Sequence, residues 1–181
     1  MNGRQWKRAR LGHMDVRIRK AELDDAPAIG LVHVKSWRQT YPRIIPDAYL
    51  AALDSEERAS MWKQALAAAR VLVFVAEDRG GIVGFIAGGA IREPIEGYDA
   101  ELYALYLTPE RQRQGLGLEL ATTLRERLQQ QGFSSMMVWV LEENLGGVSF
   151  YKRMGGLKIE QRTIDIGGKA LAELAFGWSE L

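Results

Sequence analysis

Hydrophobic and polar positions change their period several times along the chain, which predicts a mixture of strands and helices. Short apolar runs that are rich in β-branched and aromatic residues predict strands. The seven expected strands are residues 15–20, 71–77, 82–91, 101–107, 136–141, 157–165 and 171–178. Two pairs of these strands flank turns, at residues 78–81 and at Gly167 and Gly168, and each pair is expected to form a hairpin.

Four segments repeat apolar side chains every three or four residues, which is the spacing of one helix face. The clearest begins near Gly115 and contains four leucines at intervals of four residues, Leu116, Leu120, Leu124 and Leu128. The other three run from Asp25 towards Tyr41, from Ser55 to about Ala69 and from Asn144 to Met154. Since these helices interrupt the series of strands, we expect an α/β (α+β) fold with a mixed sheet flanked by helices.

The composition narrows the classes of protein to consider. With 181 residues and 47% hydrophobic content, the chain has the size and the core of one domain. The lack of cysteine excludes disulfides, thiolate zinc sites and cysteine nucleophiles. No apolar run approaches the roughly 20 residues of a membrane helix. We expect a cytoplasmic protein with no metal and no membrane partner.

Charge is distributed unevenly, although the net charge is +1. Residues 1–13 carry four basic side chains and no acidic one, whereas the remainder has 20 basic and 23 acidic side chains. A nucleic-acid binder needs a basic face on its folded part, so we expect no nucleic-acid partner. We interpret residues 1–13 as a disordered basic extension and residues 14–181 as a single domain.

The segment with the most chemical information is the strand at 101–107 with the short loop and helix that follow it. The first amides of a helix have no partner within the helix, and the helix dipole places partial positive charge there, so this junction is suited to a phosphate. Gly115 and Gly117 lack a Cβ and allow the backbone to approach a diphosphate closely. Arg111 and Arg113 add positive charge at the rim. An ordinary tight connection explains the same residues equally well.

Other nucleotide sites and a hydrolase site are disfavoured. No Gly-Lys-Ser/Thr is present in this loop, which excludes a phosphate-binding loop of the nucleoside-triphosphatase kind. Leu120 stands where the dinucleotide fingerprint needs its third glycine. A serine-histidine-aspartate site would have to use His33, and no Gly-x-Ser-x-Gly accompanies it, so we interpret His33 as a helix-face residue.

A second group of residues follows, from Asn144 to Gly155. A capped helix explains all of them, with Asn144 as the N-cap and Gly155 after the C-terminus. The same helix places the phenol of Tyr151 on its inner face, where a hydroxyl that faces a cleft can donate a proton.

Together these residues resemble the GNAT superfamily of acyl-CoA-dependent N-acyltransferases, over essentially residues 14–181. The signature Gln/Arg-x-x-Gly-x-Gly/Ala is matched by residues 112–117, after the usual strand and Pro109. The second signature is similar to Asn144, Gly147, Phe150, Tyr151 and Gly155. The resemblance implies a mostly antiparallel sheet of about seven strands with about four helices, in which the fourth and fifth strands splay apart.

The resemblance also implies acetyl-CoA as the co-substrate and a set of residues that hold it. Its diphosphate would be bound by Gln112, Arg113, Gln114, Gly115, Leu116, Gly117 and Leu118. Its pantetheine arm would lie beside Tyr106 and Leu107, in contact with Asn144. Tyr151 would protonate the departing thiolate.

The predicted activity is transfer of an acetyl group to a primary amine of a small molecule or peptide, by direct attack in a ternary complex. A protonated amine cannot attack, so a base is required. Glu101 is the candidate base, because some members of the superfamily carry a glutamate on the same strand. A water relay, or a water ordered by Tyr103, is the alternative. The backbone amide near Leu107 is the candidate donor to the oxyanion.

The acceptor site is expected to form from the first helices and a loop at residues 93–99. Its candidate contacts are Trp37, Tyr41 and Tyr103, together with the acidic residues Glu93, Glu96 and Asp99. This mixture suits a cationic amine such as a polyamine, an aminoglycoside or a peptide N-terminus. Core packing explains the aromatic residues as well, and solvation explains the acids. The chain is compatible with a homodimer, although nothing in the sequence locates an interface.

Three residues depart from the superfamily's pattern. Gly147 replaces a usual alanine, Gly156 replaces an aromatic residue and Arg113 replaces a common glycine. The two extra glycines predict a looser second helix. Together with the unproved base they keep a function of another class open, that of a catalytically silent acyl-CoA-binding sensor or subunit.

Overall fold

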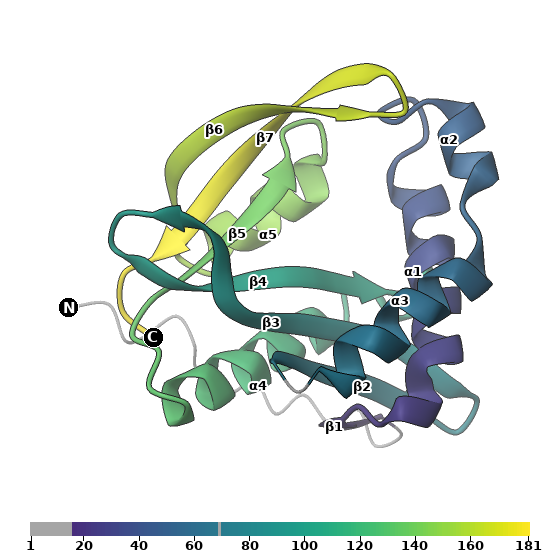
Figure 1. Cartoon of the computed structure of the whole chain (residues 1–181), viewed down its shortest axis with the longest axis horizontal. Helices are drawn as coiled ribbons and strands as arrows, with labels where there is room; N and C mark the ends of the chain where they lie inside the picture. Colours follow the sequence, from purple (N-terminus) through teal and green to yellow (C-terminus); the bar gives the residue numbers. More distant parts are fainter. Residues whose placement is uncertain (1–15, 69) are drawn as a thin grey trace.

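The computed structural model describes residues 16–68 and 70–181, which are organised around one seven-stranded sheet (Figure 1). The strands are β1 (Arg17–Lys20), β2 (Val71–Asp78), β3 (Gly81–Ile95), β4 (Tyr98–Leu107), β5 (Met136–Leu141), β6 (Leu157–Ile166) and β7 (Lys169–Trp178). Their order in the sheet is β1-β2-β3-β4-β5-β7-β6. Every neighbouring pair is antiparallel except β4 and β5, which are parallel. The predicted mixed, mostly antiparallel sheet is confirmed.

The described residues form five α-helices, one more than the sequence indicated. They are α1 (Ala26–Thr40), α2 (Asp47–Ala52), α3 (Ser55–Ala67), α4 (Leu116–Gln130) and α5 (Leu145–Arg153). Apolar side chains of α1 and α3 pack on one face of the sheet, and those of α4 and α5 pack on the other. The unpredicted helix is α2, which at 6 residues is too short to show a helical period.

The β3–β4 hairpin is longer than expected. A loop was predicted at residues 93–99, but β3 continues to Ile95, which pairs with Tyr98 of β4. The turn between them contains Gly97, whose φ of 83° is a left-handed conformation that glycine adopts without strain. The hairpin therefore continues to this turn and brings the end of β3 close to β6.

The strands β4 and β5 separate after a short stretch of pairing. Their parallel pairing runs from Ala100 to Leu102 of β4 and ends there, although both strands continue. Directly after Leu102, Tyr103 is an extra residue in β4 relative to β3, which is a β-bulge. A bulge bends its strand, so β4 turns away from β5 and a crevice opens between them. The predicted splay of the fourth and fifth strands is confirmed.

The turn between β6 and β7 reaches the N-terminal helices and bridges one side of this crevice (Figure 1). Gly167 in that turn packs against α2, and a Cβ there would lie 2.9 Å from Cβ of Tyr49. Lys169 donates a hydrogen bond from Nζ to the carbonyl oxygen of Ile44, at 2.7 Å. Apolar side chains from α1, α2, β5, β6 and β7 pack beside this contact. The crevice is therefore closed over on this side by the chain itself.

The N-terminal segment lies outside the described residues. The expectation of a disordered basic extension at residues 1–13, and of a single domain from residue 14 onward, therefore stays a prediction. Within the described ranges, no helix combines the length and the apolar character needed to cross a membrane.

Candidate active site

The junction between β4 and α4 leaves several backbone amides without a protein partner. Gly115 is the N-cap of α4 and has a φ of 89°, which favours glycine. Within the described part of the chain, no acceptor binds the amides of Arg113, Gly115, Leu116 and Gly117. Because the positive end of the α4 dipole adds to these donors, the junction is suited to a diphosphate.

Packing within the protein does not explain the glycine at position 117. A Cβ there would lie 3.5 Å from Leu107 Cδ1 and 3.6 Å from the ring of Phe150, which are ordinary contacts. Glycine is also less favourable than alanine inside a helix. Gly117 lines the cleft described below, so the space that it leaves open faces the cleft.

Ion pairs position the loop before α4. Nε and Nη2 of Arg111 donate to Oδ2 of Asp78 at the end of β2, with a distance of 3.1 Å from Nε. Lys35 of α1 binds Glu110 at 3.2 Å. The expectation that Arg111 supplies mobile positive charge is therefore wrong, because its guanidinium is engaged with Asp78. Arg113 has a φ of 58°, which explains why a glycine is common at this position, and it lines the cleft.

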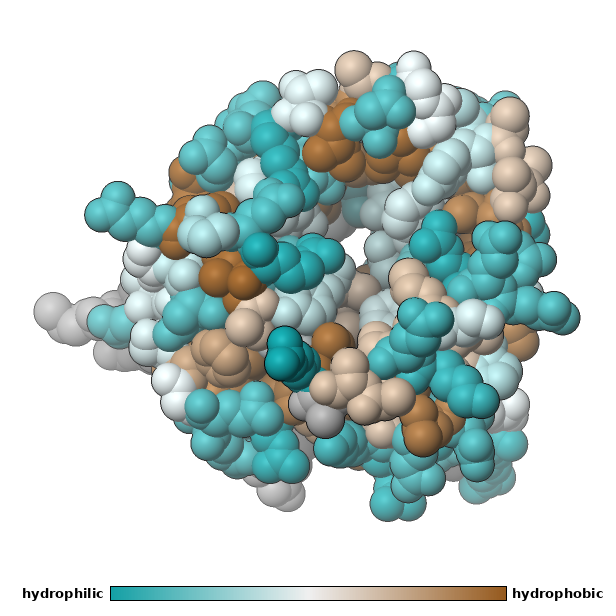
Figure 2. All heavy atoms as spheres, in the orientation of Figure 1, coloured by the Kyte–Doolittle hydropathy of each residue, from teal (hydrophilic) through white to brown (hydrophobic). Residues whose placement is uncertain are grey.

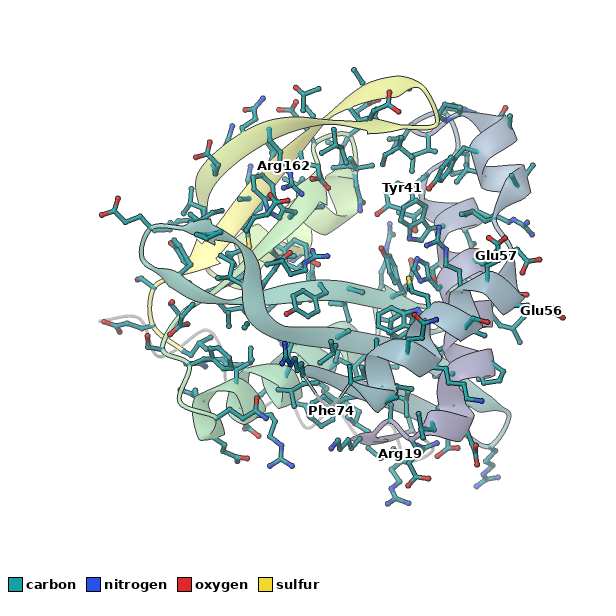
Figure 3. The ribbon with its side chains drawn as sticks, viewed as in Figure 1. Arg19, Tyr41, Glu56, Glu57, Phe74 and Arg162 are labelled. Atoms are coloured by element: carbon teal, nitrogen blue, oxygen red, sulfur yellow. The ribbon has the colours of Figure 1, made fainter. Side chains whose placement is uncertain are left out.

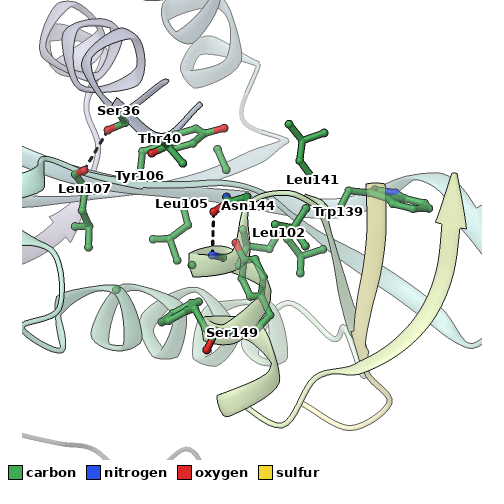
Figure 4. A pocket seen from close by; sticks show the side chains of 18 of the residues that line it. Ser36, Thr40, Leu102, Leu105, Tyr106, Leu107, Trp139, Leu141, Asn144 and Ser149 are labelled. Carbon is green, nitrogen blue, oxygen red and sulfur yellow. Dashed lines mark hydrogen bonds between the residues drawn. The ribbon is translucent and has the colours of Figure 1, made fainter. Parts of the chain in front are cut away.

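A cleft of about 1040 Å³ runs from this junction along the crevice between β4 and β5 (Figure 4). The amide of Thr108 donates to Val83 of β3 at 2.8 Å. Since successive amides of a strand point to opposite sides, the amide of Leu107 faces the crevice. Ser36 of α1 donates from Oγ to the carbonyl oxygen of Leu107 at 3.2 Å and holds this strand end in place.

Most residues predicted from the sequence line this one cleft. They are Trp37, Tyr41, Glu101, Tyr103, Tyr106, Leu107, Gln112, Arg113, Gly115, Gly117, Leu118, Asn144 and Tyr151. Gln114 and Leu116 do not line it. The Gln114 side chain donates to the carbonyl oxygen of Glu110 at 2.7 Å, and Leu116 is buried in the core. Any contribution from these two residues is therefore limited to the backbone.

Three tyrosines from separate elements meet in the cleft, namely Tyr41 after α1, Tyr106 of β4 and Tyr151 of α5. Burial raises the pKa of all three phenols, and the neighbouring phenols raise the pKa of Tyr41 and Tyr151 further. All three are therefore neutral hydroxyls at neutral pH. Figure 3 shows Tyr41 on the helical side of the central opening and Arg162 on the opposite side.

Packing explains both unusual glycines of the second signature. Asn144 caps α5 by accepting a hydrogen bond from the amide of Gly147 at 3.0 Å, and a Cβ at position 147 would lie 2.8 Å from its Nδ2. A Cβ at Gly156 would lie 2.9 Å from Trp178, the aromatic residue of β7 that fills this space. The prediction of a looser second helix is therefore wrong, because glycine is what allows the close packing here.

Glu101 lies at the other end of the cleft, and its side chain is 3% exposed. Its Oε2 accepts hydrogen bonds from the backbone N and the Nε of Arg92, both at 3.1 Å, and its Oε1 accepts from Nη2 of Arg92. The hydroxyl of Tyr103 donates to the carbonyl oxygen of Ala90, and its ring lies 4.7 Å from the Arg92 guanidinium. Both oxygens of the predicted base are thus occupied by one arginine.

The acidic cluster that we expected at the acceptor end does not form. Asp99 accepts four hydrogen bonds, at 2.9 to 3.0 Å, from the amides and hydroxyls of the two serines before β5 (134–135). These bonds lower the pKa of Asp99 although burial raises it. Glu93 binds Arg162 of β6, and Glu96 is exposed at the β3–β4 turn. The acids are separated because the segment is a paired hairpin instead of a loop.

Sequence reasoning missed a charged group at this end of the cleft. Nε of Arg162 donates to Oε2 of Glu173 on β7 at 2.9 Å, and the guanidinium lies 4.1 Å from the centre of the Trp139 ring on β5. Arg162 and Glu173 are direct partners across the β6–β7 hairpin. The turn predicted at Gly167 and Gly168 fixes this register, so the pair could have been found from the sequence. Arg92 had no such signal, since its place depends on the extended β3.

His33 takes no part in the cleft. It is 6% exposed, its Nδ1 accepts a hydrogen bond from Nε1 of Trp62 at 3.1 Å, and its ring stacks on Tyr106. Burial, with a smaller contribution from the charge of Arg58, lowers the pKa of His33 to about 4. The imidazole is therefore neutral, with its proton on Nε2, and supports the core.

We expect the free energy of unfolding to fall as the pH is lowered from 6.5 to about 4. In this range the unfolded chain binds a proton that the buried imidazole does not, a difference of roughly 3 kcal/mol at most. Urea unfolding at several pH values measures the slope. His33→Gln keeps an acceptor for the Trp62 indole but does not titrate, so its slope should be shallower. An unchanged slope would contradict this account.

Comparisons with known proteins agree with the geometry. Residues 33–156 match the family model described as Acetyltransferase (GNAT) family. The uncharacterized N-acetyltransferase YuaI of Bacillus subtilis (strain 168) is 45% identical over 169 residues, which are 92% of this chain and 94% of that protein. Spermidine N(1)-acetyltransferase of Thermoplasma acidophilum is 26% identical over 152 residues, 81% of this chain and 91% of that protein. The crystal structure of PaiA N-acetyltransferase from Thermoplasma acidophilum in complex with coenzyme A has a TM-score of 0.69 and 25% identity, and covers 88% of this chain and 98% of that one.

A helix N-terminus with open amides beside a splayed pair of strands is the arrangement of an acyl-CoA-dependent N-acyltransferase. The chain belongs to the GNAT acetyltransferase family. Among the residues with described positions, no group of three or more histidine, cysteine, aspartate or glutamate side chains is placed to hold a metal ion.

Proposed function

We propose that this enzyme transfers an acetyl group from acetyl-CoA to a primary amine of a small molecule or peptide, by direct attack in a ternary complex. The observation that carries the proposal is one continuous cleft, which joins the open amides of α4 to Glu101. Tyr106, Leu107 and Tyr151 line it between these two ends. A donor bound at one end and an acceptor at the other would meet beside these residues.

The donor end uses backbone amides and two arginines. The amides at the start of α4 bind the diphosphate, and the guanidiniums of Arg113 and Arg153, which both line the cleft, add positive charge. Gln112 and Leu118 line the same end. The pantetheine arm follows the crevice beside Tyr106 and Leu107 and contacts Asn144.

In the reaction, the amine nitrogen forms a bond to the thioester carbonyl carbon and the bond from that carbon to sulfur breaks. The amide of Leu107 donates to the carbonyl oxygen as negative charge develops on it, a contribution of about 3 kcal/mol for one such donor. Tyr151 donates its phenol proton to the departing sulfur. The surroundings that raise the pKa of Tyr151 by burial also disfavour a thiolate, so this proton transfer is matched to the site.

Removal of a proton from the amine falls to Glu101 through a water. Its two oxygens accept three hydrogen bonds from Arg92 and its side chain is nearly inaccessible, which leaves little room for direct contact with an ammonium group. A water that relays the proton fits better. The hydroxyl of Tyr103 donates to Ala90, so its lone pairs are available to order this water.

A silent acyl-CoA-binding sensor is not favoured. That alternative rested on Gly147 and Gly156, and both glycines have a packing reason that leaves the site intact. The cleft also continues past the donor end to Glu101, which a binding module without an acceptor would not require.

The test is a free-thiol release assay with the full chain, acetyl-CoA and a panel of primary amines. The panel includes spermidine, the acceptor named for the Thermoplasma acidophilum relative. We expect amine-dependent release of CoA above the rate of hydrolysis, and thermal stabilisation by acetyl-CoA but not by ATP or NAD. Tight acetyl-CoA binding without transfer to any amine would favour the silent sensor instead.

A further inference from the structure

Two arginines line the acceptor end of the cleft, and both are held rigidly. The guanidinium of Arg162 lies 4.1 Å from the centre of the Trp139 ring and donates to Glu173 and Glu93. The guanidinium of Arg92 is held in the same way, by the ring of Tyr103 and by Glu101. Each guanidinium therefore has an aromatic ring on one face and carboxylate acceptors at its edge, one for Arg92 and two for Arg162, which fixes its orientation.

Each of these guanidiniums keeps donors that no described residue uses. The hydrogen bonds of Arg162 to described residues leave its Nη2 group open, and those of Arg92 leave its Nη1 group open. The Arg162 and Arg92 side chains are 31% and 60% exposed, and both residues line the cleft. Arginine donates and never accepts, so these groups require an acceptor-bearing partner, and a carboxylate matches them best.

Each carboxylate at this end already accepts a hydrogen bond from an arginine. Both oxygens of Glu101 accept from Arg92, and one oxygen each of Glu173 and Glu93 accepts from Arg162. A polyamine offers several ammonium groups and no acceptor, so it would leave the open arginine donors unsatisfied. Together the two arginines and these three glutamates carry a formal net charge of −1, so recognition of a carboxylate depends on the directed hydrogen bonds of the open arginine groups and not on net charge.

The size of the acceptor is limited by the chain around the cleft. Figure 2 shows an opening through the middle of the molecule, which the β6–β7 turn closes over by its contact with α2. Lys169 and Ile44 form the hydrogen bond across this bridge. A side chain on the surface of a folded protein would have to thread beneath it, whereas a free small molecule enters from either mouth.

We infer that the acceptor is a small molecule that carries a carboxylate beside its amine, as an α-amino acid does, and that Arg162 and Arg92 bind this carboxylate. The inference rests on the proposed function, because it assigns the acceptor of the same reaction. The carboxylate pairs with the open donors while the amine faces the water relay of Glu101. It replaces the cationic acceptor that the sequence led us to expect.

The experiment compares matched acceptors in the free-thiol release assay. The twenty L-amino acids are each measured against the corresponding primary amide and decarboxylated amine, with spermidine alongside. We expect at least one amino acid to exceed its amide by about tenfold or more in kcat/KM, mostly through KM. Calorimetry of the matching N-acetyl amino acid and N-acetyl amide, with CoA present, should show the same preference without turnover.

Variants assign the preference to the arginine. In Arg162→Gln the ratio of kcat/KM for the amino acid to kcat/KM for its amide should fall towards one. Arg162→Lys keeps the charge but loses the planar guanidinium, and it should recover this ratio in part. Lys158→Gln removes an exposed cation from the same strand outside the cleft and should leave the ratio unchanged. Double replacement of Arg162 and Glu173 by glutamine avoids leaving the nearly buried carboxylate of Glu173 without its partner, and only the exposed Glu93 loses an ion pair. This variant should also bring the ratio towards one.

The outcomes separate the two proposals. Equal or better transfer to amides, simple amines or spermidine would overturn the carboxylate acceptor and leave the transferase intact. A ratio that survives in Arg162→Gln would also overturn it. Absence of transfer to every compound, despite binding of acetyl-CoA, would overturn both the carboxylate acceptor and the proposed function.

Discussion

Replacing Tyr151 with phenylalanine should lower kcat by about 10²- to 10⁴-fold, the range that general acid catalysis typically contributes. The phenol is buried in the cleft and stays protonated, because burial raises its pKa. Without it the sulfur leaves as an anion in surroundings of low polarity. The ring itself packs against Phe150 and Trp178, and phenylalanine preserves those contacts. The affinity for acetyl-CoA should therefore change by less than about twofold.

Steady-state kinetics at saturating acetyl-CoA, with calorimetry of CoA binding, checks this expectation. Tyr98→Phe is the matched control, because the pKa of Tyr98 is also raised by burial but the residue does not line the cleft. It should retain normal kcat. Normal turnover in Tyr151→Phe would remove the acid role, and Tyr41→Phe would then test the neighbouring phenol.

Replacing Gly117 with alanine should weaken acetyl-CoA binding by about tenfold or more while leaving the protein at least as stable. The new methyl group meets Leu107 and Phe150 only at ordinary contact distances, so the fold accepts it. Alanine also favours the helix over glycine by about 0.5–1 kcal/mol. The methyl group instead occupies the space where a diphosphate approaches the α4 amides.

Thermal unfolding and calorimetry of CoA binding measure the two effects separately. The contrast is Gly30→Ala in α1, where a Cβ would lie 2.5 Å from the backbone oxygen of Ser55. This variant should lose about 1–3 kcal/mol of stability with unchanged affinity for CoA in the folded protein. If Gly117→Ala bound CoA normally, the diphosphate would not lie against this turn.

The donor end was predictable because its signals are local. Gly115 and Gly117 stand between a strand and a leucine-striped helix, and both the open amides and the helix dipole follow from that order alone. The role of Asn144 as the N-cap of α5 was predictable for the same reason. Helix α2 was missed because a helix of 6 residues is too short to show a helical period. The β3–β4 hairpin was predicted too short because Pro94 is typical of a loop.

The acceptor end was not predictable in the same way. Glu93 and Arg162 are 69 positions apart in the sequence. They meet only because the end of β3 extends as far as the β6–β7 hairpin. The pairing of Arg92 with Glu101 depends on the register of β3 and β4, where a one-residue shift would turn the side chain to the other face. These contacts decide which carboxylates remain open.

Local order along the chain was enough to establish the family, the sheet and the diphosphate junction, because periodicity, caps and unpaired helix amides depend on neighbouring residues. The tertiary structure alone decided that the glutamates of the cleft accept hydrogen bonds from Arg92 and Arg162, that these arginines line the cleft and that the chain closes over the crevice. These features arise where distant strands meet, and their geometry is set by a bulge, a strand register and the packing of Gly167 on α2.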